Sequence, residues 1–177
     1  ETAFDDIDEI KKNCDLFIED YTCLIDKWGD ILAEKVLVGM SGGVDSSVCA
    51  LLLKEKGYDV TGVTLLLRNK LNIDTNTSCG SQSDVDDAKS ICEKLGIGHI
   101  TMDMSELFNE KVVDDFVNTY ISGKTPNPCI ECNKYMKFGA MLKVAQKLNC
   151  NYIATGHYAK TEYSEKYNRW VLKKSNA

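Results

Sequence analysis

Glycines, hydroxyls and one carboxylate are concentrated in the segment 39–47, which reads G-M-S-G-G-V-D-S-S. The segment follows an apolar run and precedes a helical pattern, so Gly42 and Gly43 would let the backbone approach an anion at a helix N-terminus. It lacks the Lys-Ser/Thr pair of a Walker A loop and the G-x-G-x-x-G spacing of a dinucleotide fingerprint. We therefore predict a cradle that holds pyrophosphate while an α-phosphate is attacked. The alternative is a purely structural glycine turn capped by Asp45.

Two cysteines, Cys129 and Cys132, form the second candidate site, in the segment T-P-N-P-C-I-E-C-N. Residues that precede proline avoid the α region, so the sequence predicts a rigid loop and then a helix that begins at Asn133. Cys132 would lie at the N-terminus of that helix, where the dipole and the basic residues Lys134 and Lys137 favour the thiolate. This predicts that Cys132 is a nucleophile.

The C-x-x-C spacing of the pair is also typical of metal-binding and redox sites. A zinc site needs four ligands, but the sequence has neither a second C-x-x-C nor a spaced histidine pair. A thioredoxin-type dithiol is expected in a different βαβ context. Two thiolates and a distant third cysteine can hold an iron–sulfur cluster that leaves one iron open. Cys79 or a cysteine beyond Ala177 would be that third ligand.

Hydrophobic patterns predict the elements that must position these residues. The expected strands are 36–40, 60–67, 97–104 and 152–155, and the expected helices are 45–56, 84–95, 108–120 and 138–148, followed by a β-hairpin. Strands that alternate with helices predict an α/β fold, a doubly wound parallel sheet with helices on both faces. Ligands of such sheets bind beyond the carboxyl ends of the strands, where segment 39–47 and His157 lie. His99, within a strand, is expected to be structural, and Asp84, Asp86 and Asp87 are expected to mark a helix start.

Residues 1–34 differ from the rest of the chain. Their apolar residues recur at spacings of three and four, which predicts an amphipathic helical extension before a domain over 35–177. They carry 11 acidic and 3 basic residues, whereas residues 121–177 carry 3 acidic and 10 basic ones. The basic C-terminal third indicates a polyanionic partner on one face, with solvated helix faces as the alternative.

Composition narrows the class of protein. The sequence has no apolar stretch of membrane-spanning length and no signal-peptide pattern at its start. Most of the eight cysteines stand singly in apolar patterns, as reduced thiols do, so we expect a cytoplasmic protein with no membrane partner. The chain begins at Glu1 without a methionine, and we expect a fragment of a longer protein.

Several segments resemble a known enzyme family. S-G-G-V-D-S-S after an apolar strand is similar to the signature of the PP-loop ATP pyrophosphatases. The segments C-G-S-Q-S-D-V-D-D-A-K, G-K-T-P-N-P-C-I-E-C-N-K and Y-I-A-T-G-H-Y-A-K follow in the order and spacing of the bacterial tRNA-specific 2-thiouridylases. The resemblance covers 35–177, and it implies the ATP-binding part of such an enzyme without its C-terminal part. Residues 1–34 match nothing in that family.

The resemblance implies ATP, Mg²⁺ and tRNA as ligands. ATP would adenylate the C2 oxygen of the wobble uridine, and a persulfide from a sulfur-carrier protein or a cysteine desulfurase would deliver sulfur, with release of AMP and pyrophosphate. Cys132 matches the family's nucleophile, Cys129 replaces a common Asp, and a second catalytic cysteine would lie beyond Ala177. The implied ATP-binding residues are Gly39, Met40, Ser41, Gly42, Gly43, Val44, Asp45, Ser46, Leu65 and Gly156. The residues expected to contact tRNA are Asn127, Pro128, Cys129, His157, Lys134 and Lys137.

Two other functions stay open at this point. One is another PP-loop enzyme, such as an amide-forming synthetase that acts on a small carboxylate. The other is a non-catalytic module that binds nucleic acid or a protein partner, for which the acidic segment 1–34 is the best argument. The cysteine pair and the basic C-terminal third argue against the synthetase.

Overall fold

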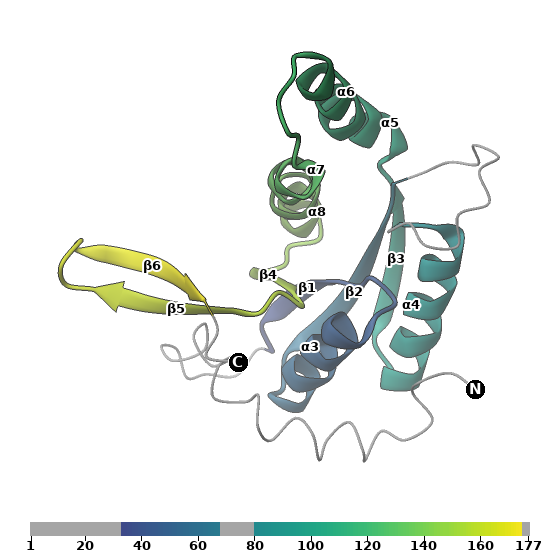
Figure 1. The fold of residues 1–177 in the computed structure, drawn as a ribbon. Coiled ribbons are helices and arrows are strands. Elements are labelled where there is room, and N and C mark those ends of the chain that lie inside the picture. Colours follow the sequence, from purple (N-terminus) through teal and green to yellow (C-terminus); the bar gives the residue numbers. More distant parts are fainter. Residues whose placement is uncertain (1–32, 68–79, 175–177) are drawn as a thin grey trace. The chain divides into compact units, whose positions relative to one another are not determined.

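A parallel sheet of four strands in the order β3-β2-β1-β4 forms the centre of the fold (Figure 1). The structure is a computed structural model, and it describes residues 33–67 and 80–174. The strands are β1 (Lys35–Gly39), β2 (Asp59–Leu66), β3 (Gly98–Asp103) and β4 (Tyr152–Thr155). Since β1 pairs with β2 on one side and β4 on the other, the strand that leads into the glycine segment is central.

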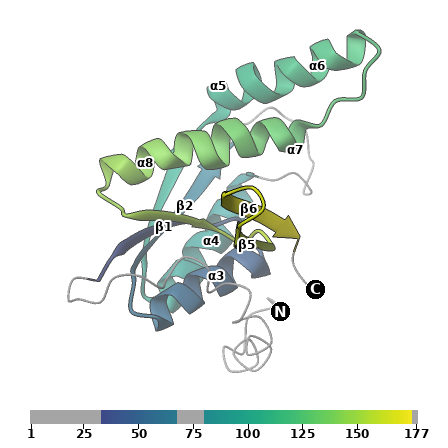
Figure 2. The same ribbon diagram turned by 90° about the vertical axis from the view of Figure 1, so that its left-hand side faces the viewer.

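Helices cover both faces of this sheet (Figures 1 and 2). On one face α3 (Val44–Glu55) contacts β1 and β2, and α4 (Gln82–Leu95) contacts β2 and β3. On the other face α8 (Met141–Lys147) contacts β1 and β4. The predicted doubly wound α/β fold is therefore confirmed.

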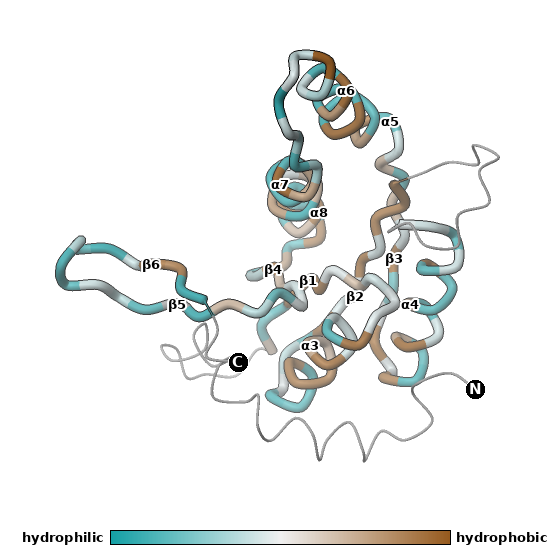
Figure 3. The backbone as a smooth tube through the Cα atoms, in the orientation of Figure 1, coloured by the Kyte–Doolittle hydropathy of each residue, from teal (hydrophilic) through white to brown (hydrophobic). Residues whose placement is uncertain are grey.

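The core explains why the strands have no alternating pattern. Val36, Leu37 and Val38 point to alternate faces, yet all three are at most 2% exposed because both faces are covered. Figure 3 shows hydrophobic stretches along the strands of the sheet. A buried cluster joins α8 to the sheet. It consists of Leu37, Val63, Met141, Val144 and Ala145.

The start of α4 is fixed by a capping box in which Asp84, one of the acids expected at a helix start, takes part. The Ser81 hydroxyl accepts a hydrogen bond from the Asp84 amide, and the Asp84 carboxylate accepts one from the Ser81 amide at 2.9 Å. Asp84 is thus the third helical residue and not the cap. Gly96 ends the helix in the left-handed conformation, with φ 60°, as predicted.

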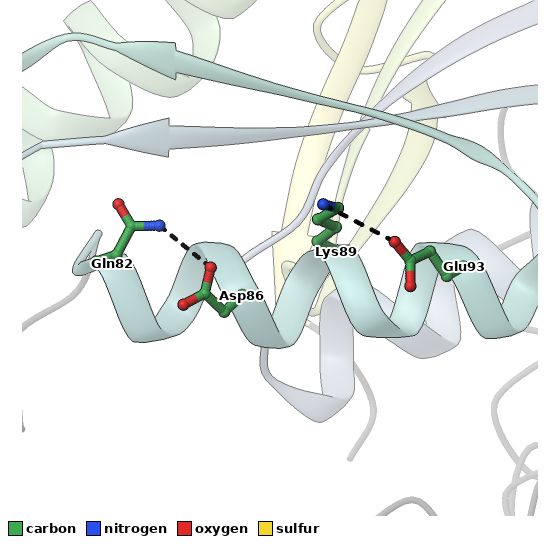
Figure 4. Close-up of polar contacts among 4 residues, drawn as sticks. All are labelled: Gln82, Asp86, Lys89 and Glu93. Carbon is green, nitrogen blue, oxygen red and sulfur yellow. Dashed lines mark hydrogen bonds and ion pairs between the residues drawn. The ribbon is translucent and has the colours of Figure 1, made fainter.

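The two faces of α4 have different chemistry. Figure 4 shows two polar pairs along the helix, Gln82 with Asp86 at 3.2 Å and Lys89 with Glu93 at 4.0 Å. The buried side chains of the helix are Val85, Ala88, Ile91 and Cys92. This division is what fastens α4 to the sheet.

Two longer helices lie side by side in Figure 2. The first joins α5 (Ser105–Phe108), the π-helical segment η2 (Asn109–Val113) and α6 (Asp114–Ile121). The second joins α7 (Pro128–Glu131), the π-helical segment η3 (Cys132–Ala140) and α8, with helical backbone at each junction.

The prediction of a loop up to Asn133 was wrong, since the second of these helices begins at Pro128. The residue before a proline avoids the α region, and Asn127 is indeed non-helical, with φ −128° and ψ 87°. Proline itself has the φ of a helix and needs no amide partner at the first helical position. The rule therefore restricts Asn127 alone and lets the helix begin one residue later.

A separate antiparallel hairpin follows, formed by β5 (Ala159–Ser164) and β6 (Arg169–Lys174), as predicted. The described residues divide into two compact units, Ala33–Gly156 and a unit that contains the hairpin from His157 onward. This division falls inside the predicted domain 35–177, whose boundaries stay a prediction.

The expected amphipathic helix before residue 34 lies outside the described residues. Among the helices described in 33–67 and 80–174, none has the length and apolar character needed to cross a membrane.

Candidate functional site

The glycine segment forms a turn that is closed by serine hydroxyls. The Ser46 hydroxyl accepts from the Ser41 amide at 3.2 Å and donates to the Gly43 carbonyl at 3.1 Å. The Ser41 and Ser46 hydroxyl oxygens lie 3.1 Å apart, and the Ser47 hydroxyl donates to the same Gly43 carbonyl at 2.7 Å. Ser46 is buried, so the structure places it where it shapes the turn from below.

The N-terminus of α3 carries no side-chain cap. Gly43 is the N-cap residue in an extended conformation, and no side chain accepts from the first amides of the helix. Asp45 lies inside the first turn of the helix and is not its N-cap residue. Because helix-starting amides have no acceptor within the helix, an anion at this exposed end would receive their hydrogen bonds.

The two glycines of the turn differ in backbone conformation and in the space that a side chain would find. Gly42 has φ +76°, and a Cβ there would lie 3.0 Å from the Asp84 carbonyl oxygen and 3.2 Å from the Asp87 Cβ. Gly43 has φ −89°, and a Cβ there would meet only the Ser41 hydroxyl, at 3.4 Å. The fold itself requires glycine only at 42, where the first turn of α4 packs against the segment. The sequence placed these aspartates at a helix start but did not reveal this contact.

Gly156 lies against the first turn of α3. A Cβ at Gly156 would come within 2.7 Å of the Asp45 carbonyl carbon and the Ser46 amide nitrogen. The carboxyl end of β4 and the N-terminus of α3 are therefore in direct backbone contact. His157 is the first residue of the other unit and is exposed.

A buried hydroxyl that the sequence did not single out supports the turn. The Thr64 hydroxyl donates to the Met40 carbonyl at 3.0 Å and lies 2.9 Å from His99 Nε2. Because the single hydroxyl proton goes to Met40, His99 Nε2 must be the donor in the second hydrogen bond. Burial is the main cause that lowers the pKa of His99, so the ring is held neutral. A threonine deep in the apolar run of β2 was the available signal.

Two other predicted nucleotide residues, Gly39 and Leu65, lie on the side of the sheet that α8 covers. A Cβ at Gly39 would lie 3.2 Å from the Met141 sulfur, so glycine lets the end of β1 pass close under the helix. Leu65 is half-buried and packs against the cluster that contains Leu37 and Met141. The structure thus brings the turn 41–46 and Gly156 together at the N-terminus of α3, whereas Gly39 and Leu65 pack against Met141 of α8 and its cluster.

The cysteine pair lies in the first two turns of the helix that begins at Pro128. Cys129 is the second helical residue and is exposed, whereas Cys132 lies one turn further on and is half-buried. The expectation that Cys132 directly adjoins the helix start was wrong, because Asn127 and not Asn133 precedes the helix. A spacing of three places the two thiols on one side of the helix.

Basic residues follow the pair on the same helix. The ammonium nitrogen of Lys134 lies 3.8 Å from a Glu131 carboxylate oxygen and 4.6 Å from the Tyr135 ring centre. Tyr135 first, and then Glu131, raise the pKa of Lys134, so it stays charged at neutral pH. Lys137 is half-buried. Lys134 therefore lies at the surface as a charged side chain.

The described residues do not by themselves complete a metal site. Cys129 and Cys132 supply two thiols, but within 33–67 and 80–174 no group of three or more His, Cys, Asp or Glu side chains is placed to hold a metal ion. An iron–sulfur cluster at this pair would need a ligand from outside that set. We therefore derive no chemical step through a cluster.

Comparison with known proteins identifies relatives of this chain. The tRNA-specific 2-thiouridylase MnmA of Clostridioides difficile is 50% identical over 143 residues, which are 80% of this chain and 40% of that protein. MnmA 1 of Syntrophus aciditrophicus is 50% identical over 145 residues, 82% of this chain and 38% of that protein. The chain thus spans about two fifths of the length of these relatives.

A solved structure and a family model complete the comparison. The NH3-dependent NAD synthetase of Campylobacter jejuni aligns with a TM-score of 0.48 at 15% sequence identity, covering 83% of this chain and 55% of that one. The family model described as the tRNA methyl transferase HUP domain matches residues 34–177, which include the glycine turn, the cysteine pair and Gly156. This chain belongs to the tRNA methyl transferase HUP domain family.

Proposed function

We propose that this chain is the ATP-using part of an enzyme that replaces the C2 oxygen of a tRNA uridine by sulfur. The observation that carries the proposal is the uncapped N-terminus of α3 behind a hydroxyl-closed glycine turn. Identity of 50% to proteins named tRNA-specific 2-thiouridylases supplies the substrate class. ATP, Mg²⁺ and a tRNA uridine are then the expected ligands.

In the first step the uridine C2 oxygen attacks the α-phosphorus of ATP. A bond forms between that oxygen and phosphorus, and the bond to the β-phosphate oxygen breaks, so pyrophosphate leaves. The first amides of α3, from Val44 onward, would donate to the departing pyrophosphate, and Asp45 would hold its Mg²⁺. Gly43 leaves the space that close phosphate approach needs.

In the second step a cysteine persulfide attacks C2 through its terminal sulfur, and AMP leaves with the former uridine oxygen. The sulfur would be received by Cys132 from a donor persulfide, on a sulfur-carrier protein or a cysteine desulfurase. A second thiol must then break the sulfur–sulfur bond, which releases the 2-thiouridine and leaves a disulfide. Asn127, Pro128 and Cys129, with His157, are the residues we assign to contact with the tRNA, in a cytoplasmic setting.

Exchange of labelled pyrophosphate into ATP tests this proposal. Exchange that requires tRNA supports uridine adenylation, and the Asp45→Ala variant should abolish it while the circular dichroism spectrum stays unchanged. Exchange that requires a small carboxylate instead would assign an amide-forming synthetase. A chain in its full-length context that shows no exchange with either would be a binding module.

The cysteine pair has a second proposed use, as two ligands of an oxygen-labile iron–sulfur cluster. The two thiols on one side of a helix favour it, and the need for a further ligand weighs against it. Anaerobic reconstitution of the full-length protein, read by iron content and charge-transfer absorption, decides the matter. A colourless, iron-free and fully active enzyme would leave the pair to thiol chemistry alone.

A further inference from the structure

The β5–β6 hairpin presents large aromatic side chains on one face. Tyr163 is paired with Trp170 in the register, and Leu172 lies two residues further along β6, so all three point to the same side. Their exposed fractions are 46%, 66% and 75%, respectively. The Tyr163 and Trp170 rings meet edge to face with centroids 5.8 Å apart. This arrangement fixes the Trp170 ring and leaves most of its surface open.

The turn of the hairpin adds a second aromatic with two cations. Tyr167 is 57% exposed, with the Lys166 ammonium 5.2 Å and the Arg169 guanidinium 5.9 Å from its ring centre. Asn168, with φ 48°, supplies the left-handed residue that the turn needs. Aromatic faces and cations therefore alternate from the turn into β6.

The hairpin also carries an excess of positive charge. Residues 159–174 include five basic and two acidic residues, a net charge of +3. Glu162 forms an ion pair with Lys173 at 2.7 Å, and the basic residues of the hairpin still outnumber its acidic ones. Figure 3 shows a mostly hydrophilic hairpin with a short hydrophobic stretch in β6.

We propose that this hairpin binds unpaired RNA nucleotides, with a base stacked on Trp170 and phosphates held by the cations at the turn. Aromatic side chains interleaved with cations are the usual means of holding single strands, because every base offers a flat face. A protein partner is disfavoured, since the centre of a protein–protein interface is depleted of Lys and Glu. The inference deepens the proposed function, on which it rests for tRNA as the natural source of the unpaired nucleotides.

Trp170 can report on its own contact. The chain has two tryptophans, so Trp28→Phe leaves Trp170 as the only indole. In that otherwise intact chain, an oligouridylate of about ten nucleotides should quench the fluorescence, whereas a blunt RNA duplex of equal charge should not. Equal quenching by both RNAs would reduce the hairpin to a nonspecific cationic surface. No quenching by either RNA would overturn the proposal.

Substitutions separate stacking from hairpin stability. In the binding of labelled oligouridylate, Trp170→Ala should weaken affinity about tenfold, while Trp170→Phe should keep most of it. Val171→Ala, on the opposite face of the same strand, is the matched control and should change little. Equal losses for Val171→Ala and Trp170→Ala would show a folding effect and contradict a stacking role.

The outcome is independent of the adenylation test. Quenching without tRNA-dependent pyrophosphate exchange would keep the RNA-binding hairpin and remove the proposed function. Exchange without quenching would keep the proposed function and remove the hairpin from RNA contact.

Discussion

The two cysteines of one helix differ in position, and this difference sets their relative reactivity. An exposed thiol is reached by an alkylating reagent more readily than a half-buried one. Cys129 lies in the first turn of the helix and is exposed, whereas Cys132 is a turn further along and half-buried. The sequence had predicted the opposite order from a helix that began at Asn133.

We therefore expect Cys129 to be alkylated faster than Cys132 at neutral pH. Iodoacetamide labelling followed by peptide mass spectrometry measures both rates in the same sample. Cys129→Ser should remove the fast phase and Cys132→Ser the slow one. Faster alkylation of Cys132 than of Cys129 would contradict this expected order.

The glycine turn gives a second pair for comparison. Gly42→Ala forces a side chain into the left-handed region and against the Asp84 carbonyl, so it should cost about 1–2 kcal/mol of unfolding free energy. Gly43→Ala meets no such obstacle within the protein and should leave stability nearly unchanged. It should instead weaken ATP binding, since its methyl group would project where phosphate approaches.

Urea denaturation and calorimetric titration with ATP separate the two effects. Equal destabilisation by both substitutions would contradict the assignment of Gly42 to the fold and Gly43 to the ligand. Unchanged ATP affinity in Gly43→Ala would remove the turn from the binding site.

Elements with a strong hydrophobic pattern were predictable to within a few residues. β1, α3, β2 and β4 lie close to their predicted ranges because burial on both faces dictates their apolar runs. The start of the helix at Pro128 was missed because proline acts in two ways, on the residue before it and as a first helical residue. Contacts of Gly42 with α4 and of Gly156 with α3 are long-range and leave no local sequence signal.

The hydrogen bonds that join β3, β2 and the glycine turn predict a pH effect. The pKa of His99 in the folded protein is lowered, by burial first and then by Lys89, with Glu93 acting against them. The unfolded chain, with an ordinary histidine pKa of about 6.5, then takes up the proton first. The stability due to neutral His99 is present above that pKa and is lost as the pH falls through the lower folded pKa.

Urea midpoints measured from about pH 7.5 to pH 5 should show this loss, because the histidine reference pKa lies inside that window. The His99→Gln variant keeps a donor toward Thr64 but cannot be protonated. In this variant, the share of the acid-induced loss of stability that is due to residue 99 should disappear. Thr64→Val should instead lower stability at every pH by about 1–3 kcal/mol, because the buried Met40 carbonyl loses its Thr64 donor. A pH profile identical in wild type and His99→Gln would contradict this account.

Across the whole chain, charge is segregated between an acidic start and a basic end. We expect four lysines to contact phosphates of a bound tRNA: Lys134 and Lys137 on the helix, and Lys160 and Lys173 in the hairpin. Lys173 is paired with Glu162 at 2.7 Å, so its contribution should be the smallest of the four. Each lysine that contacts a phosphate releases a counterion and steepens the dependence of binding on salt.

Reversal of both helix lysines, Lys134→Glu with Lys137→Glu, should weaken tRNA binding and reduce its log–log salt slope by about 1.5. Lys173→Glu is the control. It should change the salt slope less than Lys134→Glu or Lys137→Glu made singly. Filter binding over a range of salt concentrations gives these slopes. A tRNA affinity that does not respond to salt would make these lysines a solvated face.

The hydroxyl-closed turn between β1 and α3 has a consequence for the rate of ligand capture. Its shape is already set by the Ser46 and Ser47 hydrogen bonds and by the packing of Gly42 and Gly156. A ligand that meets such a rigid anion receptor has no loop to order, so little conformational entropy is lost on binding. For the proposed ATP site, we expect association to be limited by diffusion and charge rather than by rearrangement of the turn, so that selectivity among nucleotides lies in their dissociation rates.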